Sequence, residues 1–183
     1  LAENDHDIAY TKEKFNCTPA QYAEDLGWVG HDVWHAHCVK LDDEGTYLFA
    51  RTRTGIAHCP CSNMRLASGI LPLRKMLDAG VPIGLGVDGS ASNDAAHLLN
   101  EARQAMLLAR VGKAMDAPLV KDGRTVFGCD LGPSDMTPRD ALRLATRGGA
   151  EVLGRAHELG QIKEGYCADI AMFRTDTLSM AGG

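Results

Sequence analysis

Several features that would point to a membrane or to nucleic acid are absent from this sequence. No apolar run approaches the roughly 18 residues that a membrane-spanning helix needs. The first residues, Leu1 to Asp7, are acidic and lack the basic and apolar regions of a signal peptide. The 19 Lys and Arg are scattered among 24 Asp and Glu, so no basic stripe can neutralise a phosphate backbone. We therefore expect a cytoplasmic protein with no nucleic-acid or membrane partner.

The six cysteines are also too sparse for a disulfide scaffold. They lack the dense spacing of small secreted proteins, so we expect free thiols in the protein interior. The pair Cys59 and Cys61 lacks both the C-x-x-C spacing and the H-x-E partner of nucleoside-type zinc deaminases. Hydrophobic residues make up 45% of the chain, which is typical of a globular domain with an ample core.

What the chain does contain is an alternation of strand and helix patterns. Apolar, strand-like segments at 32–39, 55–60 and 82–87 are separated by helical patterns, and further helices are indicated at 18–27, 94–110 and 137–147. Residues 112–135 have little periodicity and are expected to form a loop. The order predicts an α/β fold with parallel strands, either a barrel or a doubly wound sheet. A complete (β/α)8 barrel needs about 250 residues, so we expect the second half of a TIM-type barrel.

Polar residues stand where these strands end. Asp88 follows the apolar strand Gly84–Val87 and is the leading catalytic candidate, because parallel α/β folds keep their chemistry at the carboxyl ends of strands. Strand alternation places His35 and His37 on one face, and His58 ends the next strand. Two imidazoles and a carboxylate are typical of a metal hydrolase. Each histidine is also compatible with a hydrogen-bonded core position, and Ser62 and Ser90 with turn or cap roles.

Four segments carry a resemblance to a known family. Leu1–Glu3, Ala36–Leu41, His58–Asn63 and Gly86–Gly89 are similar to the aminohydrolase branch of the amidohydrolase superfamily, which includes guanine deaminases and triazine hydrolases. The longer stretches 62–69 and 87–94 most resemble its 8-oxoguanine deaminases. The resemblance implies a barrel beside a small β-sandwich. Residues 1–158 would form the C-terminal half of the barrel, and residues 159–183 the start of the return strands of the sandwich.

The same resemblance implies a role for each candidate residue. Asp88 would be both a zinc ligand and the general base, and His37 would orient the attacking water. Glu3 would handle protons on the substrate ring, while His58 and Asn63 would help to bind the substrate. One zinc ion is expected, and its remaining histidine ligands would lie upstream of Leu1. The motif His35-Ala36-His37 also has the spacing of the family's H-x-H ligand pair, and this assignment stays open.

The implied reaction is zinc-dependent hydrolytic deamination of a purine-like ring, most simply 8-oxoguanine to urate and ammonia. An aminohydrolase acting on s-triazines or other cyclic amidines is the alternative within the same chemistry. A non-catalytic barrel fragment that acts in binding or assembly is the alternative from another class. We expect a small heterocycle as the partner and a homo-oligomeric assembly.

Overall fold

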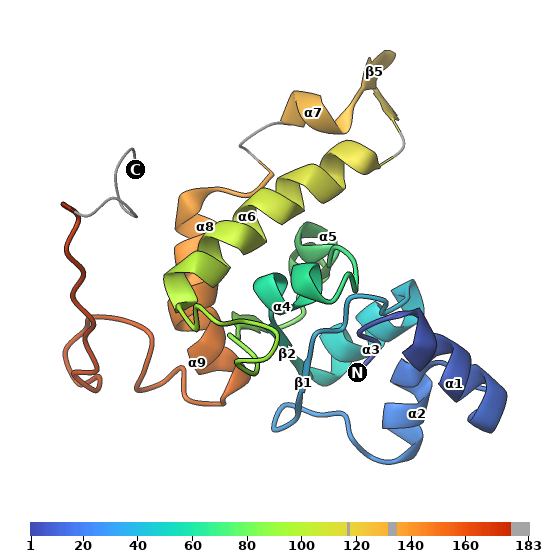
Figure 1. Ribbon diagram of the computed structural model, residues 1–183, viewed down its shortest axis with the longest axis horizontal. Helices are drawn as coiled ribbons and strands as arrows, with labels where there is room; N and C mark the ends of the chain where they lie inside the picture. The colour runs from blue at the N-terminus through green and yellow to red at the C-terminus, as the bar shows by residue number, and fades with distance from the viewer. Residues whose placement is uncertain (117, 132–134, 177–183) are drawn as a thin grey trace.

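The computed structural model describes residues 1–116, 118–131 and 135–176. At its centre lies a parallel sheet with the order β1-β2-β3, formed by Trp34–Ala36, Gly55–His58 and Ile83–Leu85 (Figure 1). His35 pairs with Ile56, and Ile56 pairs in turn with Ile83. All three strands fall within the segments predicted from the sequence, and the α/β class is confirmed.

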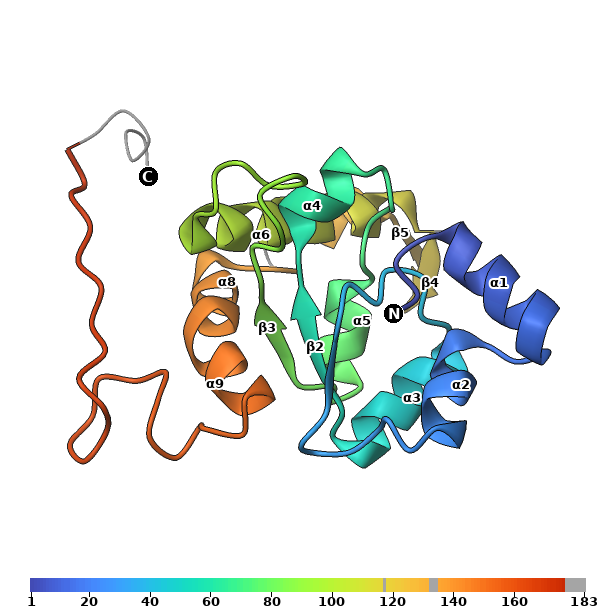
Figure 2. The same ribbon diagram turned by 60° about the horizontal axis from the view of Figure 1, so that its bottom comes forward.

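Helices connect and flank these strands. Figure 2 shows β2 and β3 side by side, with α8 and α9 next to β3. The helical segments are α1 (Asp5–Phe15), α2 (Pro19–Asp25), α3 (Asp43–Thr52), α4 (Pro60–Arg65), α5 (Leu73–Asp78), α6 (Leu98–Met115), α7 (Gly128–Leu131), α8 (Pro138–Arg143), the π-helix η2 (Leu144–Gly148) and α9 (Gly149–Val152).

Local sequence signals start two of the predicted helices. The side chain of Thr18 caps α2, with Pro19 at the first helical position. Thr137 forms a capping box with Asp140 at the start of α8. Both helices were predicted from these residues. None of the helices in the described ranges is both long enough and apolar enough to cross a membrane.

The core fills the space between the sheet and its helices. Phe49 of α3, Ile56 of β2 and Met76 of α5 are fully buried within it. The backbone of β3 comes very close to α9, because a Cβ added at Gly84 would lie only 2.7 Å from Cα of Gly149. This close approach explains why β3 needs glycine at that position.

The expected loop after the long helix contains regular structure, which differs from the sequence prediction. Within the expected loop 112–135, α6 continues to Met115 and a hairpin forms from β4 (Leu119–Lys121) and β5 (Arg124–Val126). Asp122 and Gly123 turn this hairpin with positive φ angles of 51° and 72°.

The second difference concerns the end of the chain. Return strands were expected within residues 159–183, but residues 159–176, which the structure describes, form turns, bends and coil. Figure 2 shows its backbone set off from the sheet and its helices, and the ring centroids of Phe173 and His97 lie 5.8 Å apart. Ile162 and Met172 are about nine-tenths exposed, so no apolar face is covered that would stabilise a strand pair. The return to a β-sandwich remains a prediction, and its residues 177–183 lie outside the described ranges.

Candidate active site

Three of the candidate residues come together at the carboxyl ends of the strands. His37 follows β1, and Asp88 lies three residues beyond β3. Nε2 of His37 lies 3.7 Å from Oδ2 of Asp88 and 3.8 Å from Oε2 of Glu3. An imidazole and two carboxyl groups therefore share one small volume at this end of the sheet.

Glu3 reaches this volume because the start of the chain runs beside β1. The amide of Cys38 donates to the carbonyl of Leu1 at 3.0 Å, and the amide of Lys40 donates to the carbonyl of Ala2 at 2.8 Å. Oγ of Ser68 donates to Oε1 of Glu3 at 3.0 Å. These contacts leave the other carboxyl oxygen of Glu3 turned toward His37.

Two of these three residues have an unusual backbone conformation. His37 has φ of 69° and Asp88 has φ of 61°. Side chains other than glycine are disfavoured in this left-handed region by about 1–3 kcal/mol, and such strain gathers at functional sites. The surrounding hydrogen bonds must therefore hold each residue in place.

Asp88 is the most strongly hydrogen-bonded of the three. Its Oδ2 accepts from Oγ of Ser62 at 2.6 Å and from Oγ of Ser92 at 3.3 Å, and its Oδ1 accepts from the Gly89 amide at 2.8 Å. The hydrogen bond from Ser62 is the main cause that lowers the pKa of Asp88, while partial burial works against it; the Gly89 amide, His37 and Ser92 lower the pKa further. The carboxylate is thus held ionised at neutral pH.

Asn63 of α4 fixes the ring of His37. Its Nδ2 lies 3.0 Å from Nδ1 of His37. An amide NH2 group can only donate, so Nδ1 accepts and the neutral ring carries its proton on Nε2. That N–H is the one that faces Glu3 and Asp88. Asn63 was expected to bind substrate, and the structure places it behind His37.

The other two candidate histidines, His35 and His58, lie in different surroundings. His58 is fully buried, and burial together with the nearby His37 lowers its pKa to about 3, so it is neutral. The ring of His35 stacks on Phe49, and its Nε2 contacts the carbonyl of Trp28. The expectation that His35 and His37 share a face is wrong, because β1 ends at Ala36 and alternation stops there. His35 is thus turned away from His37, which does not favour an H-x-H ligand pair here.

Three serines complete the site, and the sequence analysis did not assign them to it. Ser62 and Ser92 contact Asp88, and Ser68 contacts Glu3. Ser62 and Ser68 are buried. Ser62 lies 26 residues from Asp88 and Ser68 lies 65 residues from Glu3, so no local spacing could reveal these pairs.

The donor chemistry of this site suits a zinc ion, although the set is incomplete. Carboxylate oxygen and imidazole nitrogen are both common zinc ligands, and Asp88 offers an ionised oxygen held in place by hydroxyl groups. Within the ranges that the structure describes, however, no group of three His, Cys, Asp or Glu side chains is arranged to hold a metal. The residues present fit a partial ligand set.

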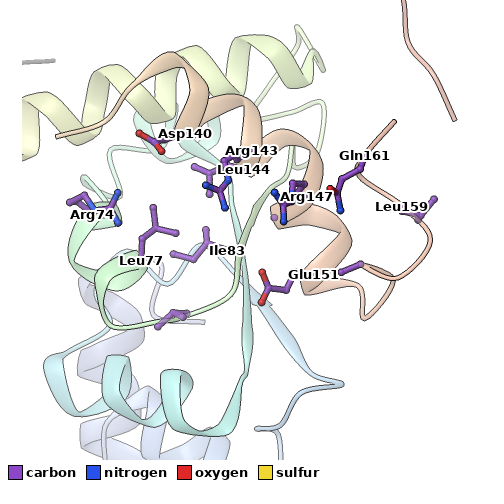
Figure 3. Close-up of a pocket in the computed structure, with 13 residues that line it drawn as sticks. Arg74, Leu77, Ile83, Asp140, Arg143, Leu144, Arg147, Glu151, Leu159 and Gln161 are labelled. Atoms are coloured by element: carbon purple, nitrogen blue, oxygen red, sulfur yellow. The ribbon is translucent and has the colours of Figure 1, made fainter. Parts of the chain in front are cut away.

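A cavity of about 320 Å³ lies elsewhere, between α5, β3 and the helices α8 to α9 (Figure 3). It borders Ile83 at the amino end of β3, whereas Asp88 follows the carboxyl end. Its lining includes the guanidinium groups of Arg74, Arg143 and Arg147. Glu3, His37 and Asp88 do not line it, so it is distinct from the site described above.

Comparison with known proteins places the site in context. The model of the amidohydrolase family matches residues 1–181. The chain is 42% identical over 170 residues to isoxanthopterin deaminase of an unknown prokaryotic organism, covering 93% of this chain and 34% of that protein. It is 40% identical over 182 residues to 8-oxoguanine deaminase of Pseudomonas aeruginosa, covering 100% of this chain and 36% of that protein.

A solved structure shows the same similarity in three dimensions. A variant of atrazine chlorohydrolase from Arthrobacter aurescens TC1, in complex with zinc and atraton, superposes with a TM-score of 0.81 at 35% sequence identity. The match covers 98% of this chain and 36% of that one. The chain therefore spans about a third of the length of the proteins that it matches.

Proposed function

The chain belongs to the amidohydrolase family, and on that basis we propose that it forms part of a zinc-dependent enzyme that removes an exocyclic amine from a purine-like ring. The observation that carries this proposal is the convergence of Asp88, His37 and Glu3. Nε2 of His37 lies 3.7 Å from Oδ2 of Asp88 and 3.8 Å from Oε2 of Glu3. A base, a hydrogen-bond donor and a second carboxyl group are the parts that hydrolysis of a cyclic amidine requires.

The favoured substrate is 8-oxoguanine. One relative with 40% identity is named 8-oxoguanine deaminase, and another with 42% identity is named for isoxanthopterin, so both names describe deamination of a fused heterocycle. In the proposed reaction, one water molecule adds to the amine-bearing carbon and ammonia leaves. The products are urate and ammonia, and no redox partner is required.

In this proposal, each residue has a separate task. Zinc, when bound, would activate the attacking water, and Asp88 would supply one of its ligands. Asp88 accepts the proton of the water at Oδ2 of its carboxylate, and the lowered pKa of Asp88 keeps this carboxylate ionised. The Nε2–H of His37 donates to the oxygen as negative charge develops there. Glu3 transfers a proton to the ring nitrogen next to the reacting carbon. The proton held by Asp88 then goes to the departing amine, which leaves as ammonia, and the hydroxyl on the reacting carbon returns a proton to Glu3 as the carbonyl forms. The other zinc ligands would come from histidines outside this chain.

His58 and Asn63 support the substrate pocket in this proposal. Asn63 sets the tautomer of His37, and its carbonyl oxygen Oδ1 is buried without a hydrogen-bond partner in the part of the chain that the structure describes. Nδ1 of His58 is buried without a partner in the same way. A substrate or an ordered water molecule that reaches these atoms would satisfy them.

An s-triazine aminohydrolase is the second candidate. It is favoured by the similarity to the atrazine chlorohydrolase variant, which was solved with a triazine ligand. The two candidates share the residues described above and differ in the lining of the substrate pocket.

Turnover of 8-oxoguanine, guanine, isocytosine and hydroxylated triazines by the full-length, zinc-loaded protein separates the candidates. We expect the highest kcat/KM for 8-oxoguanine. A preference for the triazines would favour the alternative. A full-length protein that neither retains zinc nor releases ammonia from any of these compounds would refute both and favour a binding or assembly role.

Further parts of the proposal come from the sequence. We propose that residues 1–158 are the C-terminal half of the barrel, and that residues 159–183 return to a β-sandwich. We also propose that the protein is a cytoplasmic homo-oligomer. A small heterocycle as its binding partner is consistent with the names of the deaminase relatives.

A further inference from the structure

Glu101 is a buried carboxyl group that the proposed mechanism does not use. It lies in the first turn of α6 and has no exposed surface. Its Oε2 accepts from the amide of Cys61 at 3.0 Å, and its Oε1 accepts from Nδ2 of Asn93 at 2.7 Å. A buried carboxyl group is costly unless its oxygens are satisfied, and here each oxygen has one donor.

Both donors to Glu101 belong to segments that hold Asp88. Cys61 immediately precedes Ser62, whose hydroxyl donates to Oδ2 of Asp88 at 2.6 Å. Nδ2 of Asn93 also donates to the carbonyl of Val87 at 2.8 Å, which is part of the peptide bond leading into Asp88. Two residues therefore connect Glu101 to Asp88 along each route, Cys61 and Ser62 on one and Asn93 and Val87 on the other.

These two routes of hydrogen bonds hold Asp88 and its partner Ser62 in position. Asp88 has φ of 61°, a conformation that strains a residue with a side chain. The segment between β3 and α6 must hold this conformation while Ser62, from α4, stays within hydrogen-bond distance. Since Glu101 bonds to both segments at once, it fixes the position of one relative to the other.

We propose that Glu101 is a positioning residue for Asp88, acting through Asn93 on its backbone and through the start of α4 on its partner Ser62. The effect on catalysis rests on the proposed function, whereas the effect on the order of the two segments does not.

Glu101→Gln is the most informative substitution, because it preserves shape and removes one acceptor. A glutamine at this position has a single carbonyl oxygen, so either the Cys61 amide or Asn93 faces a second donor. Asn93→Ser breaks only the route through Val87 and provides a second variant if the first does not fold. Glu44→Gln on the exposed surface of α3 is the matched control.

The variants are compared in the full-length, zinc-loaded protein by three measurements. We expect Glu101→Gln to lower kcat with 8-oxoguanine by about tenfold or more, with KM changed less than about twofold, and to weaken zinc binding by about tenfold in a chelator competition. Amide hydrogen exchange should become faster in peptides covering 59–65 and 86–93. Combining Glu101→Gln with Asn93→Ser should lower kcat by less than the product of the two separate effects.

A change in the unfolding midpoint with unchanged kcat and zinc affinity would show a purely structural role and overturn the proposal. Equally, unchanged exchange in 59–65 and 86–93 would overturn it. If the wild-type protein deaminates no substrate, the proposed function fails, and the zinc competition and the exchange measurement still decide the role of Glu101.

Discussion

Replacing Ser62 by alanine removes the shortest hydrogen bond to Asp88 and tests how far catalysis depends on that contact. The hydroxyl of Ser62 is buried and lies 2.6 Å from Oδ2 of Asp88. A hydrogen bond to a charged group contributes about 1.5–3 kcal/mol. Ser92 lies 3.3 Å from the same oxygen and can partly replace the lost donor. We therefore expect a loss of about 1.5 kcal/mol, or roughly tenfold in kcat/KM.

The assay is steady-state release of ammonia from 8-oxoguanine by the full-length, zinc-loaded protein. Ser90→Ala serves as the control, because Ser90 is exposed and lies two residues beyond Asp88. In metal-free protein, the pKa of Asp88 measured by NMR should rise toward its ordinary value in Ser62→Ala, since the Ser62 hydroxyl is the main group that lowers it. If kcat/KM of Ser62→Ala stays within twofold of both the wild type and Ser90→Ala, the reasoning about this contact is refuted.

Three further predictions concern other parts of the molecule. Ser68→Ala removes the donor to Oε1 of Glu3, a contact worth about 1 kcal/mol, and should lower kcat about fivefold; an unchanged kcat would show that Glu3 needs no such support. Because the pKa of His58 falls from 6.5 to about 3 on folding, the unfolded chain binds more protons between these values. The contribution of His58 to the free energy of unfolding is therefore fully present above pH 6.5, and it falls by up to about 1.4 kcal/mol per pH unit between pH 6.5 and pH 3. In urea titrations, His58→Leu should lack this dependence of stability on pH. The same dependence in both proteins would contradict the low pKa of His58. Gly84→Ala places a Cβ 2.7 Å from Cα of Gly149 and should cost about 1–3 kcal/mol in the free energy of unfolding, whereas unchanged stability would show that the two backbones can separate.

Structural features that depend on short stretches of the sequence could be predicted. The three parallel strands follow from their apolar runs, and α2 and α8 follow from their caps. Asp88 could be singled out because a carboxylate that follows an apolar strand lies at the functional end of a parallel sheet. Even the missed hairpin had a local signal, since Asp122-Gly123 is a common two-residue hairpin turn.

Contacts between residues far apart in the sequence could not be predicted in this way. The shortest hydrogen bond to Asp88 comes from Ser62 of α4, 26 residues away in the sequence, and no local pattern reveals a pair at that distance. Glu101 would be read from the sequence as one of several charges on a long helix, yet it is fully buried. The backbone leaves strand geometry at His37 and Cys38, where the Cys38 amide donates to the carbonyl of Leu1, and periodicity cannot supply this tertiary contact.

We propose that Asp88 both holds the metal and accepts a proton at a hydrolytic centre, and Asp88→Asn in the full-length protein tests these two roles most directly. The amide keeps the size of the side chain but removes its charge and its basicity. Turnover of 8-oxoguanine and bound zinc per protein would be measured on the same preparation. We expect turnover to fall by orders of magnitude and zinc to be retained less tightly, because Asp88→Asn loses both the ligand charge and the base. Turnover near that of the wild type with a full complement of zinc would contradict it.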